Sequence, residues 1–132
     1  MQIRVVTSRA EIATVDPEER VVHLTIPIST ADFFGLIQRC PRLEAIQVPP
    51  FKFRDVSKSS RRLLEVRGVK IFAGTVRGHR TDRTCYFTID DGLILQRAGQ
   101  LRAEGLDSGE IVAKMAEEAG VSPGLVGFIL GR

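Results

Sequence analysis

Two clusters of basic and hydroxyl side chains are the parts of this sequence best suited to chemistry. Residues 57–62 read Ser-Lys-Ser-Ser-Arg-Arg and stand where a helix is predicted to begin. Free backbone N–H groups and the helix dipole favour negative charge at such a position. Residues 77–83 form a second cluster, Arg-Gly-His-Arg-Thr-Asp-Arg. The candidates for binding an anion, either double-stranded DNA or a small anionic ligand, are Lys58, Arg61, Arg62, Arg77, His79, Arg80 and Arg83.

The first cluster also has a plain structural interpretation. Ser57 can cap the helix while Arg61 and Arg62 are solvated. The glycine-rich pattern G-x-x-x-x-G-K-[ST] of phosphate-binding loops is missing from the sequence. Both interpretations stay open at the level of the sequence.

Catalytic chemistry has little support. His79 stands near Asp82, and a His-Asp pair can act as a general base, but no serine or cysteine can be assigned to it as a nucleophile from the spacing. A metal site would have to combine His23, Cys40, His79 and Cys85, which are far apart in the sequence. We therefore expect no enzyme activity, no metal and no cofactor.

The charge of the chain is unevenly distributed. Ten Lys or Arg residues and three Asp or Glu residues lie between Lys52 and Arg83, whereas residues 91–132 carry four basic and six acidic side chains. A basic region of this kind attracts phosphate-bearing partners, although it can also be a solvated surface.

Length and composition limit the class of protein. The chain has 132 residues, of which 43% are hydrophobic and 27% charged, as in an ordinary globular domain with room for a small appendage. No apolar run reaches the roughly 18 residues that a membrane span needs, and no secretory signal is visible. Two cysteines, Cys40 and Cys85, are too few for a disulfide framework. We expect a cytoplasmic protein that does not bind membranes.

The elements that would position the basic clusters belong to an α/β body over residues 1–89. Three apolar, β-branched strands are predicted, around Leu24, Ile46 and Ile71, and each is followed by Pro or Gly. Their near-constant spacing is typical of β-α repeats, weakly like a leucine-rich repeat, and predicts a small parallel sheet. Helices are predicted after Ser29 or Thr30 and after Ser57. Both basic clusters would then follow the carboxyl ends of strands, where such sheets bind ligands.

Residues 90–132 change character and predict three short helices. Asp90 or Asp91 caps the first helix, and Asp107 begins the second with the D-x-x-E spacing of a capping box. Gly120 ends the second helix. Ser122 then caps the third, with Pro123 at its first position.

The last two helices resemble a helix-turn-helix of lactose-repressor-type regulators. The resemblance rests on residues 116–122, Ala-Glu-Glu-Ala-Gly-Val-Ser, followed by Val126 and Leu130. It implies DNA binding, with Ser122 as a further phosphate contact. The exposed positions that read bases in such regulators here hold Pro123, Gly124, Leu125 and Gly127, which offer no bidentate donor or acceptor.

The whole chain also resembles an uncharacterised archaeal family best known from methanogens, domain of unknown function 1699. The similar residues are 3–9 (Ile-Arg-Val-Val-Thr-Ser-Arg), 22–24 (Val-His-Leu), 38–41 (Gln-Arg-Cys-Pro) and 78–80 (Gly-His-Arg). The family has no established activity, so the resemblance implies the source and the two-part layout, not a mechanism.

Three functions remain open from the sequence. The first is a nucleic-acid-binding regulator with a helix-turn-helix-like tail on a basic body. The alternative is a protein-interaction or assembly factor, in which Leu125 and Phe128 of an exposed apolar helix dock a partner or form a homo-oligomer. The third, a small enzyme or nucleotide-binding protein, would use Lys58, Arg61, His79 and Arg80.

Overall fold

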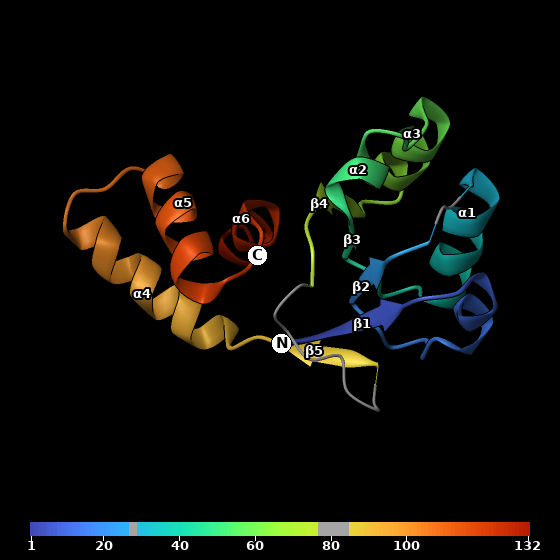
Figure 1. Cartoon of the computed structure of the whole chain (residues 1–132), viewed down its shortest axis with the longest axis horizontal. Coiled ribbons are helices and arrows are strands. Elements are labelled where there is room, and N and C mark those ends of the chain that lie inside the picture. Colours follow the sequence, from blue (N-terminus) through green and yellow to red (C-terminus); the bar gives the residue numbers. More distant parts are fainter. Residues whose placement is uncertain (27–28, 77–84) are drawn as a thin grey trace.

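The chain forms a five-stranded sheet with helices on both faces (Figure 1). The computed structural model describes residues 1–26, 29–76 and 85–132. The strands are β1 (Gln2–Val6), β2 (Val21–Leu24), β3 (Ala45–Val48), β4 (Lys70–Ala73) and β5 (Tyr86–Thr88), in the order β4-β3-β2-β1-β5. Four strands are parallel, and β5 pairs antiparallel with β1 at one edge. The prediction of an α/β fold with a small parallel sheet is confirmed.

The parallel strands follow one another in sequence order across the sheet. Val22 lies beside Ile46, and Ile46 lies beside Ile71, so equivalent positions of successive repeats are neighbours. Each crossover moves the chain by one strand in the same direction, and its helix therefore lies on the same face. The elements on this face are η1 (Arg9–Thr14), α1 (Thr30–Arg39), α2 (Pro50–Phe53) and α3 (Lys58–Val66). The sequence predicted α1 and α3, whereas η1 and α2 were not expected.

The three predicted C-terminal helices cover the opposite face of the sheet (Figure 1). They are α4 (Asp91–Ala103), α5 (Ser108–Ala119) and α6 (Pro123–Leu130). Their N-caps are Asp90, Asp107 and Ser122, and Gly120 adopts a left-handed φ of 68° between α5 and α6. None of the helices within residues 1–26, 29–76 and 85–132 has the length and apolar composition needed to cross a bilayer.

Alternating side chains of the strands build two separate cores. Val22 and Leu24 of β2 pack in the core beneath α1 and α3. Val21 of the same strand belongs to the core that includes Leu125 of α6. The division into residues 1–89 and 90–132 stays a prediction, and the two parts share this second core.

Close packing of α6 on β4 depends on a glycine. A Cβ atom added to Gly124 would lie 2.7 Å from Cβ of Phe72, too close for either backbone to remain in place. We expect Gly124→Ala to lower the free energy of unfolding by about 1–3 kcal/mol, measured by urea denaturation, because the added methyl group overpacks this contact.

Gly127, one turn later on the same helix, provides the matched control for Gly124→Ala. A Cβ added there meets nothing within 4 Å. Gly127→Ala should therefore leave stability unchanged or raise it by up to about 1 kcal/mol, since alanine favours the helix. Equal effects of the two substitutions would contradict the close packing of α6 on β4.

Candidate nucleic-acid interface

The candidate interface lies where α2 and α3 follow the carboxyl end of β3. Val48 ends β3, and α2 begins two residues later at Pro50. Lys58 is the first residue of α3 and is exposed. Ser57 caps α3, because its Oγ accepts a hydrogen bond from N of Ser60 at 3.1 Å. Ligands of parallel α/β sheets commonly bind at this edge.

Hydroxyl groups join the beginnings of α1 and α3. Oγ1 of Thr30 lies 2.8 Å from Oγ of Ser60 and 3.3 Å from Oγ of Ser57. Ser60 is buried. These hydroxyls hydrogen-bond to one another and hold the two helices together, which confirms the capping role of Ser57.

The beginning of α1 already holds a carboxylate. Asp32 and Ser29 form a capping box, and Nε of Arg9 lies 3.1 Å from Oδ2 of Asp32. Burial alone would raise the pKa of Asp32, but the hydrogen bonds from Ser29 and the charge of Arg9 outweigh it and lower the pKa. A second anion at this helix end would be repelled, so we place the interface on α2 and α3.

Among the described residues, Arg61 and Arg62 of α3 are engaged by other groups, unlike Lys58. Nη2 of Arg61 donates to the carbonyl of Phe53 at 2.7 Å, and the guanidinium stacks 4.4 Å from the centre of the Phe53 ring. Arg62 forms an exposed ion pair with Glu65 at 3.7 Å. Arg61 thus connects α2 to α3, and only Lys58 of the three is an exposed cation without such a partner among the described residues.

An aromatic side chain on α2 was not identified from the sequence. Phe51 is 66% exposed, and Nζ of Lys52 lies 5.6 Å from the centre of its ring. Arg54 is exposed, and no ion pair between residues of the described ranges involves it. We define the α2–α3 basic surface as Phe51, Lys52, Arg54, Lys58, Arg61 and Arg62. The only signal in the sequence was the alternation of Phe with Lys and Arg over residues 51–54.

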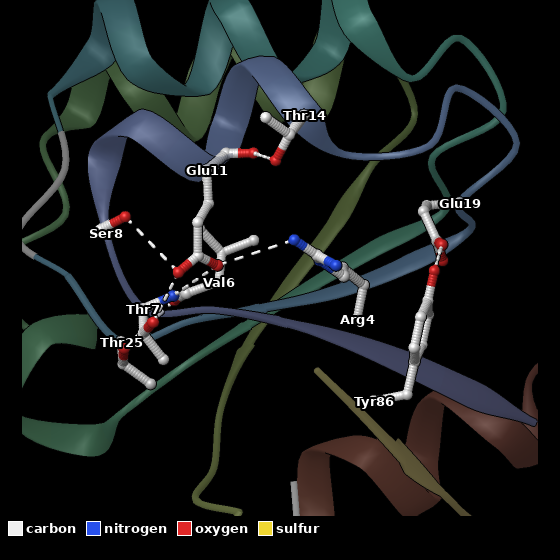
Figure 2. Close-up of polar contacts among 9 residues, drawn as sticks. All are labelled: Arg4, Val6, Thr7, Ser8, Glu11, Thr14, Glu19, Thr25 and Tyr86. Carbon is white, nitrogen blue, oxygen red and sulfur yellow. Dashed lines mark hydrogen bonds and ion pairs between the residues drawn. The ribbon is translucent and has the colours of Figure 1, made fainter. Parts of the chain in front are cut away.

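A second polar cluster surrounds Arg4 of β1 (Figure 2). Nη2 of Arg4 lies 3.7 Å from Oε2 of Glu11, and its guanidinium lies 5.9 Å from the centre of the Tyr86 ring. The hydroxyl of Tyr86 donates a hydrogen bond to Glu19. Oγ1 of Thr7 donates to Glu11 at 2.7 Å.

The ionisation of this cluster is fixed near neutral pH. The hydrogen bond from Thr7 lowers the pKa of Glu11, so the carboxylate is charged. Burial, together with the hydrogen bond to Glu19, raises the pKa of Tyr86 to about 12, so the phenol is neutral. The cluster therefore joins η1 and the loop after it to β1 and β5, and neither Glu11 nor Tyr86 is poised to transfer a proton.

The residues predicted on the C-terminal tail are largely covered by the sheet. Oγ of Ser122 donates to Oε1 of Gln47 at 2.9 Å and also caps α6, so it has no free position for a phosphate. Leu125 is only 1% exposed, and its assignment to an interaction surface is wrong because α6 packs this side chain into the core. Phe128 is half-buried beside Phe72, with ring centres 6.0 Å apart.

What remains accessible on α6 cannot read bases. Its exposed residues are Pro123 and Gly127, which carry no hydrogen-bonding side chain. Phe128 and three glycines of α6 and its C-terminal end line a groove of about 550 Å³ against β4, the edge strand of the sheet. A protein partner or a homo-oligomer docked on this C-terminal helix stays a prediction.

Arg77, His79, Arg80, Asp82 and Arg83 fall outside the described residues. No group of three or more potential metal ligands occurs within residues 1–26, 29–76 and 85–132.

His23 and Cys40 cannot share a metal ion. His23 hydrogen-bonds to Gln47 on the face covered by α6, whereas Cys40 is buried in the core beneath α1 and α3. Burial raises the pKa of the Cys40 thiol to about 11, so it is protonated near neutral pH. A protonated, buried thiol is a poor nucleophile and a poor metal ligand.

The fold and its exposed surfaces define a mixed α/β protein with a basic face on one side of the sheet and a three-helix layer on the other. The chain belongs to the family of unknown function DUF1699, and its residues 2–84 match the model of the N-terminal domain of that family. The matched segment includes all four parallel strands. Searches of the curated proteins and of the solved structures found no match. The family resemblance is thereby confirmed, and the archaeal source stays a prediction.

Proposed function

We propose that this protein binds nucleic acid through the α2–α3 basic surface, which contacts phosphate groups. The observation that carries the proposal is the pair of exposed cations Arg54 and Lys58, which have no ion pair within the described part of the chain. They flank the short connection between α2 and α3. Cations that are not neutralised by neighbouring carboxylates can replace the counterions of a phosphate backbone.

The charge around these two cations supports the same conclusion. Residues 52–76 carry seven Lys or Arg side chains against two acidic ones, Asp55 and Glu65. Glu65 is already paired with Arg62. The helices on the other face are net acidic, so the electrostatic field orients the α2–α3 side of the molecule toward a polyanion.

Binding of this kind does not depend on sequence. Phosphate contacts fix the position of a protein on nucleic acid, whereas sequence is read from base edges by side chains that donate or accept hydrogen bonds. Because the contacts proposed for the α2–α3 basic surface are to phosphate groups, we expect similar affinities for duplexes of different sequence.

We expect Lys58→Ala and Arg54→Ala each to weaken binding and to reduce the slope of log affinity against log salt by about 1, because each removes one phosphate contact. The measurement is fluorescence anisotropy of a labelled random-sequence duplex over a salt series. Neither substitution should change stability, since both side chains are exposed.

Lys114→Ala is the matched control for these two variants. Lys114 is an exposed cation of α5, on the opposite side of the sheet, and no ion pair between described residues involves it. Lys114→Ala changes the net charge by the same amount as Lys58→Ala and Arg54→Ala, and it should leave the salt slope unchanged. If Lys114→Ala lowers the slope as much as Lys58→Ala does, the attraction is general to the whole chain and the assigned surface is wrong.

A further inference from the structure

We propose that the α2–α3 basic surface binds an unpaired nucleic-acid strand, with one base stacked on the ring of Phe51. The proposal rests on the function proposed above and specifies the form of nucleic acid. It begins from an exposed aromatic ring among cations, the combination with which proteins bind single strands.

The two aromatic rings of α2 are in different situations. The Phe53 ring is covered by the guanidinium of Arg61 at 4.4 Å. The Phe51 ring is 66% exposed, and the ammonium of Lys52 lies near it. A face of Phe51 is therefore available to a flat apolar ligand, whereas Phe53 is occupied.

Phe51 stands on a rigid support. Pro50 fills the first position of α2, and the N–H groups of Lys52 and Phe53 both donate to the carbonyl of Pro49 at 2.9 Å. Arg61 fixes the other end of α2 through the carbonyl of Phe53. A platform that is already ordered loses little conformational entropy when a base stacks on it.

Cations accompany the exposed ring of Phe51. Nζ of Lys52 lies 5.6 Å from the centre of the Phe51 ring and donates to the carbonyl of Thr25, which holds the charge beside the ring. Arg54 and Lys58 continue the positive charge along the chain. The surface thus combines one stacking position with several phosphate positions.

An unpaired strand fits this arrangement better than a duplex. Within a duplex both faces of each base are covered by neighbouring bases, so a Phe side chain cannot stack without opening the helix. In a single strand every base offers a free aromatic face, and stacking on a protein ring contributes roughly 1–3 kcal/mol per base. The duplex can use only the cations.

The test is Phe51→Ala, measured by anisotropy with a labelled oligouridylate of about 12 nucleotides and with a duplex of equal length. We expect the variant to lose roughly 5- to 150-fold in affinity for the single strand and to keep its affinity for the duplex. The salt slope should be unchanged, because no charge is removed. Val66→Ala, at an apolar side chain of α3 that is 67% exposed, should change neither affinity.

Phe51→Trp provides a direct signal, because the chain contains no tryptophan. Its fluorescence should be quenched by the oligouridylate and not by the duplex. The same variant distinguishes a membrane surface from nucleic acid, since a blue shift with phosphatidylglycerol vesicles and no response to the oligonucleotide would overturn the proposal.

The two proposals fail in distinguishable ways. If both oligonucleotides bind and Phe51→Ala weakens neither, the stacking proposal is overturned while phosphate binding stands, provided that Lys58→Ala still lowers the salt slope. If neither oligonucleotide binds even at low salt, both proposals are overturned.

Discussion

Leu125→Ala is expected to lower the free energy of unfolding by about 2–5 kcal/mol, the range for truncating a fully buried leucine. Leu125 is 1% exposed and belongs to the core between α6 and the sheet, together with Val21 and Ala45. Truncation removes apolar contacts and leaves a cavity that the sheet cannot collapse to fill. Urea denaturation followed by far-UV circular dichroism measures the loss.

Leu93→Ala serves as the control on a neighbouring helix. Leu93 belongs to α4 and is 59% exposed, so its truncation should change stability by no more than about 0.5 kcal/mol. The alternative role of Leu125, a docking or dimer contact, makes the opposite prediction. If Leu125→Ala kept the stability of the wild type and only dissociated an oligomer, α6 would not be packed on the sheet.

The sequence could identify α6 as a helix but not the surface that covers it. Ser122, Pro123 and the apolar positions around Val126 determine where the helix begins and that it is apolar. Such a pattern fits a buried helix and an exposed docking helix equally well. The covering surface, the face of the sheet that carries Gln47 and Phe72, comes from residues more than 50 positions away in the chain.

Signals within one turn of the chain were sufficient to predict where most of the helices begin or end. Ser29, Ser57 and Asp107 each accept a hydrogen bond from the backbone N–H three residues later, at the beginnings of predicted helices. Gly120 occupies the left-handed conformation expected of it. These features depend on residues within one turn, and for that reason they can be inferred from the sequence alone.

The candidate interface was predicted only in part, because the short helix α2 was not recognised in the sequence. Lys58 was identified correctly as an exposed cation at a helix start, whereas Arg61 was expected to share its role. The partners of Arg61 are the carbonyl groups of Phe53 and Val56 and the ring of Phe53. Phe53 belongs to α2, a four-residue helix with too few residues to show a periodic pattern. Without α2, neither the fixed position of Arg61 nor the exposure of Phe51 could be inferred.

Acidification is expected to remove about 3 kcal/mol of stability through one side chain, His23. The imidazole is 1% exposed, and burial lowers its pKa from 6.5 to about 4. Its Nδ1 lies 2.9 Å from Nε2 of Gln47, whose Oε1 accepts a hydrogen bond from Ser122. The amide nitrogen of Gln47 therefore donates to Nδ1, and a proton on Nδ1 would break this buried contact between β2 and β3.

The stability of the folded protein depends on pH because the pKa of His23 is lower in the folded chain than in the unfolded chain. Between pH 6.5 and 4 the unfolded chain binds a proton at His23 and the folded chain does not, so stability is complete above about pH 6.5 and falls as the pH decreases to about 4. A shift of this size corresponds to about 3 kcal/mol. The carboxylates whose pKa values are lowered, among them Glu11 and Asp32, begin to lose their contribution only below their ordinary values of 4.5 and 3.8.

Two histidine variants isolate this effect in urea denaturation at a series of pH values. His23→Gln cannot bind the proton, so its stability should be nearly constant between pH 6.5 and 4.5, whatever its absolute value. His79→Gln removes the other histidine of the chain and should retain the full pH dependence of the wild type. If the loss instead disappears in His79→Gln and persists in His23→Gln, then His23 is not held neutral between the sheet and α6. A loss that follows His23 would show that its imidazole is held neutral in the folded protein, within a hydrogen-bond chain that runs through Gln47 to Ser122 of α6.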